Sequence, residues 1–221
     1  MDSNPLQTAI LFHIGPIPIS EAVVTTWAIM GLLVLVSWLA LGRGEGSTSE
    51  TALEVLVETL QEQINEIMGR DSPQFLTLIG SLFLFLVCAN LSAVVPGVKA
   101  PTAHIETPAA LAAVVFISVH YFGIRARGWR GYFQHYAQPS LLLLPLNVLS
   151  EITHTFSLMI RLFGNMMSHE FVLAIVAILA GLIVPIPFLA LGVLIGVIQA
   201  YIFTVLAAVY ISAAAGRAES E

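Results

Sequence analysis

The chain has 221 residues, of which 57% are hydrophobic and only 10% are charged, and its mean hydropathy is +0.90. These values exclude an ordinary soluble enzyme and are typical of an integral membrane protein. The formal net charge of −6 is a poor guide to partners because the acids are concentrated in one segment. We therefore expect a lipid bilayer around the chain and no nucleic-acid partner.

Long apolar runs predict an all-α integral membrane protein with about five membrane-crossing helices in a single membrane domain, residues 1–221. A helix needs about 20 apolar residues to cross about 30 Å of hydrocarbon, so each run can cross once. In chain order the runs are residues 22–41, 75–95, 108–124, 140–184 and 186–215.

Residues 50–68 predict an amphipathic helix that does not cross the membrane. Its glutamates repeat every four residues, while its aliphatic side chains line another face: Glu50, Glu54, Glu58, Glu62 and Glu66, against Leu53, Val57, Leu60, Ile64 and Ile67. Interfacial helices that bind anionic lipid usually carry lysine and arginine. An acidic face instead indicates a helix at the membrane surface that either rests against protein or faces solvent.

The run at residues 140–184 is too long for a simple crossing. As one helix it would measure about 67 Å, twice the thickness of the hydrocarbon layer. The sequence leaves two possibilities open, which are two crossings broken near Gly164 or one long, steeply inclined helix.

The basic residues predict the orientation. If the crossings alternate, six of the eight lysines and arginines share one side, and these are Arg43, Arg70, Arg125, Arg127, Arg130 and Arg217. Lys99 lies opposite. The positive-inside rule then predicts an external N-terminus and a cytoplasmic C-terminus.

Arg161 lies inside the fourth run, where a charged side chain costs at least about 2.5–3.5 kcal/mol on insertion scales. At about 100° per residue, five polar side chains lie within about 40° of it: Ser150, His154, Ser157, Asn165 and Ser168. Glu151 and His169 lie to one side, and Glu170 points roughly opposite. One helix therefore carries a surface with a permanent positive charge and another with groups that titrate.

The chemistry of these groups differs. Arg161 keeps its proton and can hold a carboxylate but cannot relay protons, whereas His169 and Glu170 can exchange protons near neutrality. In an alternative reading, Arg161 only forms a buried ion pair with Glu151 or Glu170. His154 is equally consistent with a packing role.

Polar residues elsewhere extend the candidate site. Gln199 in the last run should face another helix, and the polar surface around Arg161 is the nearest in sequence. His104 and Glu106, between the second and third crossings, could form an external entrance for cations. The single cysteine, Cys88, has no partner for a disulfide or a metal cluster, so we expect no metal and no cofactor.

These residues carry a family resemblance. It is strongest over residues 145–212, in "PLNVLSEITHTFSLMIRLFGNMMSHE" and "VPIPFLALGVLIGVIQAYIFTVLAAVYIS", and continues more weakly through "FLFLVCANLSAVVPG" and "PTAHIETPAALA". In these segments the chain resembles subunit a of the F-type ATP synthases, in its shorter bacterial and chloroplast form.

The resemblance implies a fold, a mechanism and a set of residues. The last two long helices would form a tilted hairpin against a rotating c-subunit ring, which favours the single inclined helix. An ion would enter one aqueous half-channel, neutralise a ring carboxylate, and leave through a second half-channel beyond Arg161. The family's arginine, asparagine, half-channel glutamate and last-helix glutamine fall on Arg161, Asn165, Glu170 and Gln199. Further half-channel candidates are His104, Glu106, Glu151, His154 and Ser157.

The resemblance also implies departures and partners. Many members carry Asp-x-Asn where this chain has His104-Ile105-Glu106. Some carry a last-helix histidine where this chain has Gly192, and His169 would replace it across the helix pair. The subunit would be non-catalytic and would assemble in a bacterial inner membrane with the c-subunit ring, the b-type peripheral stalk subunits and the remainder of the synthase.

The coupling ion and the protein class have alternatives. The ion is a proton or sodium, because the ring's binding site largely selects it. A stand-alone secondary transporter could use Arg161 to bind an anionic substrate, but it predicts an internal repeat and we find none. A structural membrane scaffold would not need a helix with two polar surfaces.

Overall fold

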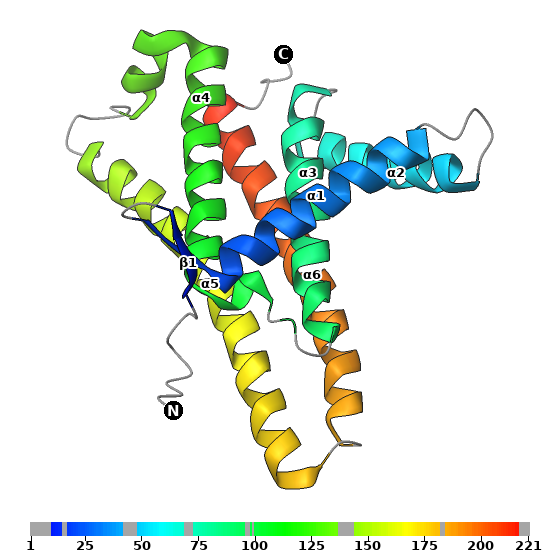
Figure 1. Cartoon of the computed structure of the whole chain (residues 1–221). Helices are drawn as coiled ribbons and strands as arrows, with labels where there is room; N and C mark the ends of the chain where they lie inside the picture. Colours follow the sequence, from blue (N-terminus) through cyan, green and yellow to red (C-terminus); the bar gives the residue numbers. More distant parts are fainter. Residues whose placement is uncertain are drawn as a thin grey trace.

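The computed structural model describes residues 10–14, 17–41, 48–68, 73–95, 98, 100–136, 144–181 and 184–216. These residues form six α-helices, two short 3-10 helices and a small two-stranded ribbon (Figure 1). The helices are α1 (Glu21–Leu41), α2 (Thr48–Met68), α3 (Pro73–Leu91), α4 (Glu106–Tyr136), α5 (Leu144–Ala180) and α6 (Pro185–Ala215), with the 3-10 helices η1 (Ser92–Val94) and η2 (Pro101–Ala103) between α3 and α4. Five of the α-helices, all except α2, are long and apolar enough to cross a membrane, which confirms the predicted fold class.

One element was not predicted, an antiparallel ribbon that precedes α1. Strand β1 (Ile10–Ile14) pairs with β2 (Ile17–Ser20) in a register that places Ile14 opposite Ile17. The runs are rich in β-branched isoleucine, which favours strands, but they are too short to show a clear alternation. The ribbon adds a minor β element to an otherwise helical chain.

The fourth apolar run forms one uninterrupted helix. α5 continues through Gly164 without a break, so two crossings broken at that point are not what the chain adopts. Its 37 residues correspond to about 55 Å of helix, well beyond the 30 Å of hydrocarbon. A helix of this length fits within a membrane only if it is steeply inclined. In Figure 1, α5 and α6 form a hairpin that extends below the other helices.

The third crossing extends further than its apolar run. α4 begins at Glu106 and includes Gly128, whose φ of 72° and ψ of 162° are essentially restricted to glycine. The helix axis changes direction there, and the chain folds back so that the ring of Tyr132 lies against Gly123 and meets His120 edge-on. The segment beyond Gly128 therefore covers the end of the crossing helix.

The core is built around α6, which contacts α2, α3, α4 and α5. Many of the buried side chains of α6 are small, including Gly196, Ala200, Ala207, Ala208 and Ser212. Small residues let helix backbones approach closely, which is a main source of packing energy in lipid. α5 contributes a narrow buried stripe of Leu158, Leu162 and Met166, so most of its remaining surface is left open.

Four of the basic residues that predict the orientation lie outside the described residues, namely Arg43, Arg70, Lys99 and Arg217. Arg125, Arg127 and Arg130 lie around the bend of α4, at the end of the third crossing. The side on which each terminus lies therefore stays a prediction.

Candidate functional site

The polar surface around Arg161 is open on this chain. We call it the Arg161 stripe and define it as Ser150, His154, Ser157, Arg161, Asn165 and Ser168. Four of its side chains are exposed, and those of Ser157 and Arg161 are half-buried. Arg161 lies near the middle of α5, where a helix in a membrane meets hydrocarbon. Lipid cannot satisfy such groups, so protein or water must cover the stripe.

The guanidinium of Arg161 has few bonds within the chain. Its Nη2 donates to Ser157 Oγ at 3.5 Å, which is at the long limit for a hydrogen bond. Among the residues that the structure describes, Arg161 forms no ion pair with Glu151 or Glu170. The alternative in which Arg161 only locks two helices together through a buried ion pair therefore finds no support among the described residues. Within that part of the chain, the bond to Ser157 leaves most of the guanidinium donors for another acceptor.

Asn165 connects the Arg161 stripe to α6. Its Nδ2 donates to Gln199 Oε1 at 2.6 Å, and Gln199 is 2% exposed. Gln199 thus faces α5 and the Arg161 stripe, as the sequence predicted. The buried Gln199 Nε2 has no hydrogen-bond partner among the described residues, and a buried orphan donor of this kind calls for a water molecule or an outside acceptor.

The titratable side of α5 meets two different elements. The imidazole of His169 lies directly against Gly192 on α6, in the space that a Cβ at position 192 would occupy. The carboxylate of Glu170 accepts a hydrogen bond from the backbone N–H of Ala100 at 3.1 Å. His169 and Glu170 are therefore held by α6 and by the connection between α3 and α4, away from the Arg161 stripe.

The other end of the stripe carries an aromatic pair. His154 stacks on Tyr210 of α6 with ring centroids 4.7 Å apart and planes only 6° from parallel. Glu151 is half-buried on the same stretch of α5. His154 precedes Arg161 by about 10 Å along the axis, and Glu170 follows it by about 13 Å. Titratable groups therefore stand on both sides of the arginine.

His104 and Glu106 lie where α4 begins, but they have different surroundings. Glu106 is exposed, and its Oε2 accepts a hydrogen bond from Ser20 Oγ at 2.6 Å. The Nε2 of His104 is buried and has no partner among the described residues. Ser20, the last residue of the β ribbon, thus contacts the first residue of α4 and links the ribbon to the third crossing.

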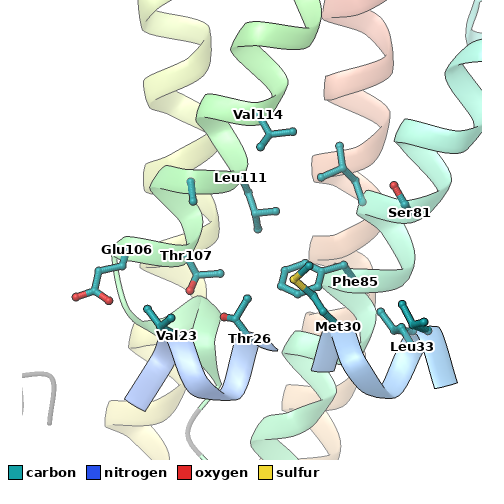
Figure 2. Close-up of a pocket in the computed structure, with 13 residues that line it drawn as sticks. Val23, Thr26, Met30, Leu33, Ser81, Phe85, Glu106, Thr107, Leu111 and Val114 are labelled. Atoms are coloured by element: carbon teal, nitrogen blue, oxygen red, sulfur yellow. The ribbon is translucent and has the colours of Figure 1, made fainter. Parts of the chain in front are cut away.

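A groove of about 470 Å³ lies between α1, α3 and α4 (Figure 2). Glu106 and Thr107 mark one end of it, and the rest of the lining is almost entirely apolar. Its hydroxyls bond to their own helices, because Thr26 donates to the Ala22 carbonyl and Ser81 to the Leu78 carbonyl. Beyond the end marked by Glu106 and Thr107, the groove thus offers mainly apolar side chains, which do not favour an ion path along its length.

A buried polar cluster at the end of α3 was not predicted from the sequence. Asn90 is 3% exposed, and its Nδ2 donates to the Gly196 carbonyl of α6 at 2.8 Å. Its Oδ1 accepts from Thr102 Oγ1, also at 2.8 Å, and Thr102 is fully buried. The available signal was an asparagine in an otherwise apolar run, where a polar side chain needs a specific partner.

Comparison with known proteins adds the family. The model of the ATP synthase A chain family matches residues 23–212, which is most of the chain. The chain belongs to the ATP synthase A chain family. Subunit a 2 of the ATP synthase of Bradyrhizobium sp. (strain BTAi1) is 56% identical over 220 residues, covering 98% of each chain.

Less similar members of the ATP synthase A chain family also match nearly the whole chain. ATP synthase subunit a 2 of Pelobacter propionicus is 45% identical over 209 residues, covering 94% of this chain and 92% of its own. ATP synthase subunit a of Legionella pneumophila (strain Philadelphia 1) is 41% identical over 204 residues, covering 91% and 89%. The resemblance seen in residues 145–212 is thereby confirmed over nearly the whole chain. The family is that of ATP synthase subunit a and not a family of stand-alone transporters.

Proposed function

We propose that the chain is the non-catalytic stator subunit of a rotary F-type ATP synthase and that its Arg161 stripe faces the c-subunit ring. The observation that carries the proposal is a largely exposed polar stripe near the middle of a long helix, whose arginine forms no ion pair with the described residues. Such a surface must be covered by protein or water at membrane depth, and its permanent positive charge favours a protein partner that carries carboxylates. A ring of helices that each carry a carboxylate supplies the complementary charge.

Arg161 would separate the uptake of the ion by the ring carboxylate from its release. An ionised ring carboxylate is costly in lipid, so it approaches only where an opposing cation stabilises it. Beside Arg161 the carboxylate releases its ion, and it re-enters lipid only after it is neutralised again. The same positive charge repels small cations and so separates the two half-channels. Arginine suits this role because desolvation does not remove its charge, whereas a desolvated lysine can become neutral.

The half-channels follow from the two groups of titratable residues. The external path would include Glu170 and His169, with His104 and Glu106 nearer its mouth. Glu170 contacts the connection between α3 and α4, His169 precedes it on α5 and lies against α6, and His104 and Glu106 lie where α4 begins. The internal path would include Glu151, His154 and Ser157. Asn165 and Gln199 would hold the helix pair at the level of Arg161.

The proposal also includes the partners, the membrane and the coupling ion. Two relatives named as ATP synthase subunit a match over nine-tenths or more of this chain, which supports a place within that complex. The c-subunit ring and the b-type peripheral stalk subunits would be the direct partners, in a bacterial inner membrane with the N-terminus outside and the C-terminus in the cytoplasm. The ion would be H+, with Na+ as the alternative selected by the ring.

The experiment that tests the proposal replaces the charge of Arg161. In inverted membrane vesicles that contain the whole synthase, Arg161→Ala should abolish ATP-driven proton pumping while the complex stays assembled. Arg161→Lys should fail as well. The control is Thr153→Ala, because the exposed hydroxyl of Thr153 lies outside the Arg161 stripe and bonds to the Leu149 carbonyl of its own helix, and this variant should pump at a rate close to wild type. Coupled pumping by either arginine variant would refute the mechanism.

A further inference from the structure

Glu170 is held by a chain of buried contacts that begins on α3. The backbone N–H of Ala100 donates to Glu170 Oε1 at 3.1 Å. Two residues later, Thr102 Oγ1 donates to Asn90 Oδ1 at 2.8 Å. The short segment 100–103 therefore contacts α5 through Ala100 and α3 through Thr102. Its own turn is closed by a hydrogen bond from Ala103 N to Ala100 O at 3.0 Å.

Asn90 also connects α3 to α6. Its Nδ2 donates to the Gly196 carbonyl at 2.8 Å, and a Cβ at position 196 would lie only 3.0 Å from the Asn90 Cβ. Glycine at 196 is what permits this close approach. Gln199 follows Gly196 by three residues, so the same side chain that holds segment 100–103 also holds the turn of α6 that presents Gln199.

The burial of these groups shows that they do not line a water path. Asn90 is 3% exposed, Thr102 is 0% exposed, and the side-chain oxygen and nitrogen of Asn90 each bond to protein. A buried asparagine with both of its polar atoms bonded is costly to disturb, because any group left unpaired loses its hydrogen bond without gaining water. The cluster is thus a rigid support for the groups that it connects.

We infer that Asn90 and Thr102 are positioning residues for Glu170, and this inference rests on the proposed function. Neither touches the carboxylate. They act through segment 100–103, which brings the Ala100 N–H to Glu170 and so sets the orientation in which the carboxylate meets the external path. Loss of the Thr102 hydroxyl releases the segment and lets Glu170 turn away from its working position.

A double-mutant cycle in the whole synthase tests this inference, because groups that act through one contact show non-additive effects. Thr102→Val keeps the shape of the side chain but removes its hydroxyl, and Thr102→Ser keeps the hydroxyl. Glu170→Asp keeps a carboxyl but shortens the side chain by one methylene, so it loses the Ala100 contact. The rate of ATP-driven proton pumping is measured in inverted vesicles with matched amounts of assembled complex.

Thr102→Val should slow pumping about fivefold, since it leaves the buried Asn90 oxygen unpaired, and Thr102→Ser should restore most of the rate. In the Glu170→Asp background, Thr102→Val should cause no further loss. The matched control is Thr204→Val, a buried threonine whose hydroxyl donates to the Ala200 carbonyl of its own helix. It should pump as wild type in both backgrounds.

Two results overturn the inference while leaving the proposed function intact. One is a wild-type pumping rate in the Thr102→Val variant or in the Glu170→Asp variant. The other is a double variant whose rate falls by the product of the two single losses, which would mean that the two residues act independently. If Thr102→Val does not assemble, Thr102→Ala takes its place in the same cycle. Failure of the proposed function would appear separately, as coupled pumping by the Arg161→Ala variant.

Discussion

The imidazole of His169 on α5 lies in the space that a side chain at Gly192 on α6 would need. A Cβ at position 192 would overlap three ring atoms, so the two helices approach closely at this level only because residue 192 is glycine. The contact joins two positions that lie in different apolar runs. It also places a titratable ring beside Glu170, the next residue of α5.

The contact predicts the effect of Gly192→Ala. The added methyl group must displace the His169 ring or separate the helices, and overpacking of this kind typically costs about 1–3 kcal/mol. We expect slower ATP-driven proton pumping in inverted vesicles, measured with a pH-sensitive dye. Gly31→Ala is the control, because a Cβ at Gly31 would meet nothing within 4 Å. Equal rates for the Gly192 variant and the control would show that the position of the ring does not matter.

The hydrogen bond between Asn165 and Gln199 predicts a coupled pair. Gln199→Leu leaves the Asn165 amide without its acceptor, and we expect a loss of about 1 kcal/mol, or roughly fivefold in pumping rate. Asn165→Leu should have a similar effect, and the double variant should be little worse than either single one. A double variant with fully additive losses would mean that the two amides act independently.

We expect Glu170→Gln to slow proton transport without loss of assembly. The amide keeps an oxygen that can accept from the Ala100 N–H, so the local contact survives, but the side chain can no longer take up and release a proton. We expect the pumping rate to fall by about tenfold or more, with normal amounts of assembled complex on native gels. Wild-type rates in this variant would remove Glu170 from the ion path.

We expect Gly128→Ala to lower the stability of the folded subunit. The φ of 72° and ψ of 162° at this position cost a non-glycine residue about 1–3 kcal/mol. We expect a lower melting temperature and less assembled subunit in the membrane. Gly131→Ala is the control in the same segment, because a Cβ there would make only an ordinary contact, 3.6 Å from the Arg127 Cβ. Equal melting temperatures for the two variants would contradict the strain argument.

Local periodicity was enough to predict much of the architecture. The apolar runs became five long helices, and the four-residue repeat of glutamates became α2. The residues of the Arg161 stripe lie on one continuous helix, and four of the six side chains are exposed. These features depend on residues three, four or seven positions apart, and helical geometry alone determines their relation.

Other features could not be predicted because they join distant parts of the chain. Asn90 and Gly196 are 106 positions apart, Ser20 and Glu106 are 86 apart, and Ala100 and Glu170 are 70 apart. Periodicity places a side chain on a face but does not say which element covers that face. The ribbon of β1 and β2 was missed for a related reason, because its strands are only five and four residues long.

The sequence by itself determined that this chain has about five helices long and apolar enough to cross a membrane, and that one of them carries a permanent positive charge. Composition and helical periodicity are local properties, and the cost of a charge in lipid does not depend on the rest of the fold. Only the tertiary structure decided that α5 passes through Gly164 unbroken, that Arg161 is not neutralised within the described chain, and that Glu170 is held by the connection between α3 and α4. Those outcomes depend on which helices pack together, and packing is decided by the close approach of small residues on elements far apart in sequence.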